Sequence, residues 1–145
     1  MNTSMIVILG LILTSLLTGV GVYDYRYSQR LAQTAKVEEQ RADGRDALLE
    51  LAKRQEIFFA KSKAYTTDLA ALGYADITDL SVFSPKKHYK LVILSADENN
   101  YALAAEPQEE QLADTKCAGL TLTKQGMAKS ARGPDTTACW QPPES

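Results

Sequence analysis

The pattern of hydrophobic and polar positions changes along the chain, and its first part is a long apolar segment. Residues 5–22, MIVILGLILTSLLTGVGV, contain no charged side chain. A helix of this length would span about 27 Å, close to the thickness of the hydrocarbon core of a bilayer. We therefore expect a transmembrane helix over residues 5–23, after a short extension at residues 1–4. A cleaved signal peptide is the alternative, but no basic residue precedes the segment and no clear Ala-x-Ala site follows it.

Helical composition continues beyond the apolar segment. Residues 24–46 are mostly polar and predict a helical stalk, in which Gly44 lowers helix propensity and favours a bend or a local fray. From residue 47 the apolar side chains recur with the period of a helix and form one stripe. The side chains that should pack on a protein core are Leu48, Leu51 and Phe58 of this stripe, with Phe59 beside it.

The segment after the helix predicts turns and loops. Residues 65–74, YTTDLAALGY, are typical of a short helical turn that is capped by Thr66 or Thr67 and ends at Gly73. Residues 75–87 are loop-like in composition.

The periodicity then changes to that of strands. Residues 88–96 and 100–107 flank the turn cluster Asp-Glu-Asn-Asn and predict an antiparallel hairpin. Residues 119–131, GLTLTKQGMAKSA, predict a third strand with a turn near Gln125 and Gly126. One long helix followed by an antiparallel sheet predicts an α+β fold, with a globular head over residues 47–141 and a tail at residues 142–145.

Charge and cysteine content add little about partners but suggest a compartment. The 145 residues carry a net charge of −2, which is not decisive for any class of partner. The two cysteines, Cys117 and Cys139, would stabilise a small domain by roughly 3 kcal/mol if they were paired, and pairing would indicate an oxidising compartment such as a periplasm. Two free buried thiols are the alternative.

Catalytic, metal-binding and cofactor-binding patterns find little support in the sequence. His88 is the only histidine, and it is more typical of an exposed polar residue than of a ligand or general base. The cysteines are too far apart for a Cys-x-x-Cys redox motif, and no glycine-rich phosphate loop is present. We therefore expect a protein without enzymatic activity and without a cofactor.

Two sets of residues are candidates for binding. In the apolar segment, small residues spaced by four would allow close packing of a second membrane helix; they are Gly10, Thr14 and Thr18, with Ser15 and Gly19. Basic side chains without an intervening acidic residue gather around the loop between the cysteines; they are Lys116, Lys124, Lys129 and Arg132. Such a loop could bind DNA phosphates, although a solvated surface loop has the same composition.

The order of these segments resembles that of type IV pilins, in particular the minor pilins. The resemblance covers residues 41–140 and is carried by RADGRDALLELAKRQEIFFAKSKAYTTDLAALGY, YKLVIL, YALAAEPQEEQLADTKCAGLTLTKQG and the final CW. It implies a long N-terminal helix that anchors the precursor in the inner membrane and bundles with neighbouring subunits in a filament. It also implies a head in which a sheet and a C-terminal disulfide loop, closed by Cys117 and Cys139, form the outer surface.

The N-terminal end departs from the pilin pattern. Residues 1–22 contain no Gly-Phe processing site, and the first acidic residue is Asp24. We therefore expect the apolar segment to be retained, without peptidase processing or N-methylation. Arg26 and Arg30 would place the head in the cytoplasm by the positive-inside rule, but the resemblance and the paired cysteines favour the periplasm.

The sequence therefore predicts a pilin-like structural or assembly component of a type IV pilus system. It would be a single-pass protein of a bacterial inner membrane with its head in the periplasm, or a subunit of the pilus. Its partners would be membrane lipid and other pilins or assembly proteins, through the N-terminal helix. The alternatives are a membrane-anchored module that presents the loop between the cysteines to DNA or a protein, and a pseudopilin of type II secretion.

Overall fold

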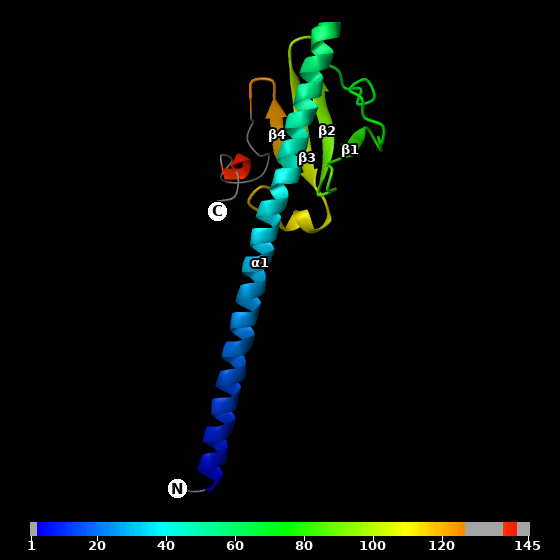
Figure 1. Cartoon of the computed structure of the whole chain (residues 1–145). Coiled ribbons are helices and arrows are strands. Elements are labelled where there is room, and N and C mark those ends of the chain that lie inside the picture. The colour runs from blue at the N-terminus through cyan, green and yellow to red at the C-terminus, as the bar shows by residue number, and fades with distance from the viewer. Residues whose placement is uncertain (1–2, 127–137, 142–145) are drawn as a thin grey trace. The chain divides into compact units, whose positions relative to one another are not determined.

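The computed structural model describes the backbone of residues 3–126 and 138–141, with side chains from residue 21 onward. The elements are α1 (Thr3–Ser62), β1 (Ser81–Phe83), β2 (Tyr89–Ala96), β3 (Tyr101–Pro107), the 3-10 helix η1 (Glu109–Ala113), β4 (Leu120–Thr123) and the 3-10 helix η2 (Ala138–Trp140) (Figure 1). Two compact units meet between Lys36 and Val37, within α1. We call the second unit the head. It begins at Val37, whereas the sequence pattern placed its start at residue 47.

The first unit consists of α1 up to Lys36, and its described side chains are exposed. Several of them are large and hydrophobic, namely Val22, Tyr23, Tyr25, Tyr27 and Leu31. Within the described residues, no helix combines the length and the apolar character that crossing a membrane requires. Most of the expected membrane segment, with its small residues Gly10, Thr14, Ser15, Thr18 and Gly19, lies outside the described side chains.

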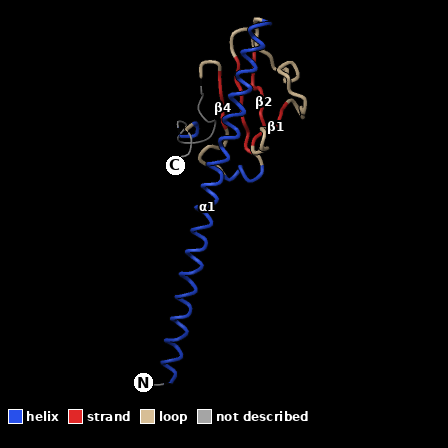
Figure 2. Tube along the Cα trace, in the orientation of Figure 1, coloured by secondary structure: helices blue, strands red, loops and turns tan. Residues whose placement is uncertain are grey.

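The head contains a four-stranded antiparallel sheet in the order β1-β2-β3-β4 (Figure 2). The expected hairpin is confirmed as β2 and β3, whose register is shifted between Ile93 and Ser95. The expected third strand is confirmed as β4, and Thr123 is bridged to Gly126 across the turn that ends it.

Strand β1 corrects the expectation of a loop over residues 75–87. Only three residues form it, and Val82 pairs with Leu91 of β2. Both side chains are buried in the core. A strand this short carries no periodic signal of its own, because its position depends on pairing with β2.

The region between α1 and β1 also differs from its prediction. Residues 65–74 form hydrogen-bonded turns and no helix. The hydroxyl oxygen of Thr66 accepts the amide of Asp68, and Gly73 adopts a φ of 84°, a conformation that favours glycine.

The head part of α1 packs on the sheet and completes the α+β fold (Figure 2). Leu48 and Leu51 are fully buried, whereas Phe58 and Phe59 are half-buried and contact the edge of the core. Gln55 lies on the same stripe and is also buried. Its side-chain amide exchanges two hydrogen bonds with the backbone of Thr66, which satisfies the polar group.

Gly44 is a close-packing position, and α1 continues through it, so the expected local fray is absent. A Cβ atom added at this residue would lie 2.7 Å from the ring of Tyr89. The ring is fully buried, and its burial raises the pKa of the Tyr89 phenol. Glycine at this position therefore allows the helix to approach the first residue of β2.

We predict that Gly44→Ala destabilises the head by about 1–3 kcal/mol, because the added methyl group overlaps a buried ring. The measurement is urea-induced unfolding followed by circular dichroism. Gly21→Ala is the matched control, since a Cβ there would meet no atom within 4 Å. An equal response of the two variants would show that the contact with Tyr89 does not limit packing.

Candidate functional site

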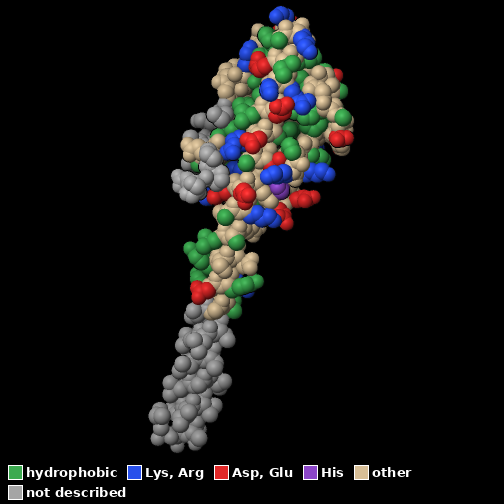
Figure 3. Space-filling view, in the orientation of Figure 1, with side chains coloured by type: hydrophobic (Ala, Val, Ile, Leu, Met, Phe, Trp, Pro, Cys, Tyr) green, Lys and Arg blue, Asp and Glu red, His purple; other side chains and the backbone are tan. Residues whose placement is uncertain are grey.

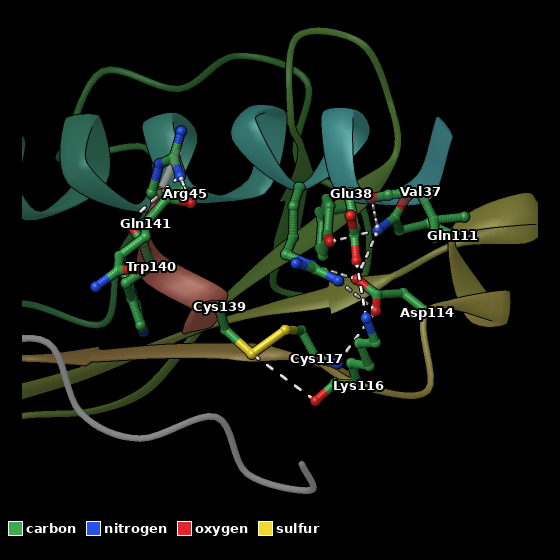
Figure 4. Close-up of a disulfide and its surroundings, with 12 residues drawn as sticks. Val37, Glu38, Arg45, Gln111, Asp114, Lys116, Cys117, Cys139, Trp140 and Gln141 are labelled. Carbon is green, nitrogen blue, oxygen red and sulfur yellow. Dashed lines mark hydrogen bonds and ion pairs between the residues drawn. A yellow bond between two sulfur atoms is a disulfide. The ribbon is translucent and has the colours of Figure 1, made fainter. Parts of the chain in front are cut away.

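The disulfide between Cys117 and Cys139 is confirmed, and both cysteines are buried (Figure 4). The alternative of two free thiols is therefore wrong. The bridge closes the loop that the sequence analysis considered for binding. The two ends of this loop are each held by an arginine of α1.

Arg41 holds the first end of the loop through a buried ion pair. Its Nε donates to Asp114 at 2.6 Å, and its Nη2 donates to the second carboxylate oxygen at 2.8 Å. The same carboxylate accepts the amide of Cys117 at 3.2 Å. Burial lowers the pKa of Arg41, but the hydrogen bond and the charge of Asp114 outweigh this effect and raise it. The guanidinium is therefore a permanent positive charge at the start of the loop.

Gln111 of η1 extends this network to the helix backbone and to β2. Its side-chain nitrogen donates to the carbonyl of Val37 at 3.0 Å and to the hydroxyl of Tyr89 at 2.8 Å. It also lies 3.3 Å from a carboxylate oxygen of Asp114. Figure 4 shows Gln111 beside Val37, with Asp114 below them. The segment before Cys117 is thus fixed to α1 at several points.

Arg45 holds the second end of the loop. Its Nη1 donates to the carbonyl oxygens of Trp140, at 3.3 Å, and Gln141, at 2.9 Å. Arg41 and Arg45 are one turn apart and lie on the same side of the helix. One turn of α1 therefore fixes both ends of the disulfide loop.

A third segment, the turn between β1 and β2, is held by Asp43. The carboxylate accepts the hydroxyl of Ser84 and the amides of Lys86 and His88. Lys86 and Lys87 are exposed, and His88 is half-buried. Figure 3 shows lysine and arginine side chains next to the single histidine, with acidic side chains among them. This turn was not among the binding candidates predicted from the sequence, although the run SPKKHYK carries two adjacent lysines.

The four basic residues expected around the disulfide loop do not form one cluster among the described side chains. Lys116 pairs with Glu38 of α1 at 3.1 Å. Lys124 instead donates to the carbonyl of Asn99 at 2.9 Å and lies 5.3 Å from the ring centre of Phe59. At 1.5 Å per residue, these two contacts on α1 are about 30 Å apart. Lys129 and Arg132 lie outside the described residues.

The turn between β1 and β2 carries the adjacent lysines Lys86 and Lys87, and we call it the dibasic turn. A groove of about 440 Å³ lies beside it. The turn contributes Pro85 and Lys86, and α1 contributes the carboxylates of Asp46 and Glu50. These acidic groups would repel phosphate, so an anion would meet the outer side of the turn rather than the groove. Across the side chains that are described, no group of His, Cys, Asp or Glu is arranged to hold a metal ion.

We predict that Asp114→Ala destabilises the head by about 3–5 kcal/mol, because it leaves the guanidinium of Arg41 buried without its counter-ion. Lys116→Ala removes an exposed ion pair and should cost less than about 1 kcal/mol. Thermal or urea unfolding compares the two variants. Equal losses of stability would mean that the buried pair does not hold the loop.

Comparison with known families gives one match for the region described above. The model of the family described as "Type IV minor pilin ComP, DNA uptake sequence receptor" matches residues 26–121, about two thirds of the chain. The matched region includes Arg41, Asp43, the dibasic turn and Asp114. Comparison with curated proteins yields no match. The chain therefore belongs to the ComP family of type IV minor pilins.

Proposed function

We propose that this minor pilin takes part in DNA uptake and that its head binds the phosphates of DNA through the turn between β1 and β2. Membership of the family supports a component of a type IV pilus, and the family's description names a DNA uptake sequence receptor. The proposed activity is binding, without a catalytic step. This combines the structural role expected from the sequence with the DNA-binding alternative.

The observation that carries the proposal is the pair of exposed lysines on a fixed turn. Among the ion pairs of the described residues, none involves Lys86 or Lys87. Lys116 is already paired with Glu38, and Lys124 is bound to the backbone of Asn99. The ammonium groups of Lys86 and Lys87 are therefore better placed than those of Lys116 and Lys124 to bind phosphates in place of counter-ions.

The charge of the whole chain limits how such binding would work. A net charge of −2 gives no long-range attraction to DNA, so local contacts must supply the affinity. Each phosphate contact contributes a slope of about −0.9 to the dependence of log K on log salt concentration. We therefore expect modest affinity that weakens steeply as salt is added.

We further propose that the N-terminal part of α1 anchors the protein in the inner membrane and contacts other pilins. Residues 5–22 are free of charge, and the following residues expose Tyr23, Tyr25 and Tyr27, a residue type enriched at membrane interfaces. The disulfide supports a head in the periplasm, because such bonds persist in oxidising compartments.

We predict that the double change Lys86→Ala and Lys87→Ala weakens binding of the full-length protein to double-stranded DNA. The salt slope, which is the slope of log K against log salt concentration, should become less steep by about 2, or about 1 for each lost phosphate contact. Fluorescence anisotropy with a labelled duplex oligonucleotide measures both quantities over a series of salt concentrations.

The matched control is the double change Lys53→Ala and Lys61→Ala, which removes the same charge from exposed positions of α1. This control should retain the salt slope of the unchanged protein. Equal losses in both variants would place the DNA contact elsewhere. No binding by the unchanged protein would favour a purely structural subunit of the pilus.

A further inference from the structure

Asp43 differs from its acidic neighbours on α1 because it is buried. The residue is only 8% exposed, whereas the side chain of Asp46, three residues later, is 73% exposed. One carboxylate oxygen of Asp43 accepts the Ser84 hydroxyl at 2.5 Å, and the other accepts the Lys86 amide at 3.1 Å. A carboxylate withdrawn from water in this way needs such donors.

The turn that Asp43 holds has hydrogen bonds at every backbone amide that can donate. The amide of Ser84 donates to the carbonyl of Tyr89, and the amide of Tyr89 donates to the hydroxyl of Ser84. Lys87 donates to the carbonyl of Ser84, while the amides of Lys86 and His88 donate to Asp43. These hydrogen bonds together stabilise the conformation of the turn.

Lys87 also shows why the turn needs this support. Its φ is 63°, in the left-handed region that costs a residue with a Cβ roughly 1 kcal/mol or more. A side chain in this region persists only where its surroundings determine the backbone. The hydrogen bonds to Asp43 flank Lys87 on both sides and supply that constraint.

We propose that Asp43 is a positioning residue for DNA binding, whose buried carboxylate holds Lys86 and Lys87 in the conformation that meets phosphate. This inference rests on the proposed function of the turn. It assigns an acidic residue a favourable part in binding an anion. The cost of ordering two lysines would otherwise be subtracted from the binding free energy.

The inference predicts that DNA affinity decreases when the charge of Asp43 is removed, whereas simple electrostatics predicts an increase. Removing a negative charge close to bound DNA should strengthen binding if charge alone matters. Asp46 is the control for this effect, because it is exposed on the same helix and lines the same groove as Lys86. Asp43→Asn and Asp46→Asn change the net charge equally, but only the first removes hydrogen bonds to the turn.

The experiment measures DNA affinity from the fluorescence anisotropy of a labelled duplex oligonucleotide. It compares the full-length unchanged protein with each full-length variant, at a temperature at which all of them are folded. Asp46→Asn should bind as tightly as the unchanged protein, or more tightly. Asp43→Asn should bind several-fold more weakly, with a salt slope reduced by about 1 to 2. Adding Asp43→Asn to the Lys86→Ala and Lys87→Ala variant should cause no further loss, since the positioned groups are then absent.

Three results bear on the inference differently. Equal or tighter binding by Asp43→Asn would overturn it and leave the proposed function intact. Absence of binding by the unchanged protein would overturn the proposed function itself. If Asp43→Asn does not fold, Ser84→Ala replaces it, because this change keeps the carboxylate and removes only the two hydrogen bonds of the Ser84 hydroxyl, one to Asp43 and one from the amide of Tyr89. Weaker binding by Ser84→Ala would then support the inference, and unchanged binding would overturn it.

Discussion

The ion pair between Arg41 and Asp114 is the contact on which the arrangement of the head depends. It joins α1 to a segment 73 residues later in the chain, and both side chains are almost completely removed from water. Two buried charges are tolerable only together, so the pair fixes η1 and the backbone before Cys117 relative to the helix. Arg45, one turn later, repeats the attachment at the other end of the disulfide loop.

The helix therefore has two tasks in the head, and they fall on different stretches. Leu48 and Leu51 pack in the core with the sheet, while Arg41, Asp43 and Arg45 hold three segments outside the sheet strands. Loops placed by a rigid element suit binding, because the element orders them before the partner arrives. The binding surface we propose is thus an exposed turn held by a helix rather than a cleft.

Local patterns in the sequence predicted the α+β fold and the β2–β3 hairpin, because helix period, strand alternation and turn residues are properties of neighbouring residues. Long-range contacts were beyond such patterns. Gly44 suggested a bend or a fray from its propensity alone, whereas the structure places the ring of Tyr89 against it, and β1 exists only through pairing with β2. Asp43 falls within the segment predicted as a polar stalk, and nothing nearby marks it as buried, since its partners lie more than forty residues away. Sequence proximity grouped Lys116 with Lys124, which the fold separates along α1.

The central claim is that DNA meets the turn between β1 and β2, which Asp43 of α1 holds, rather than the opposite end of the sheet. The most direct measurement is an NMR titration of the isotope-labelled full-length protein with a duplex oligonucleotide. The account predicts that the amide signals of Lys86, Lys87 and His88 shift as DNA is added, while those of Asn99 and Lys124 stay in place. Shifts centred on Asn99 and Lys124, with the turn unaffected, would contradict it.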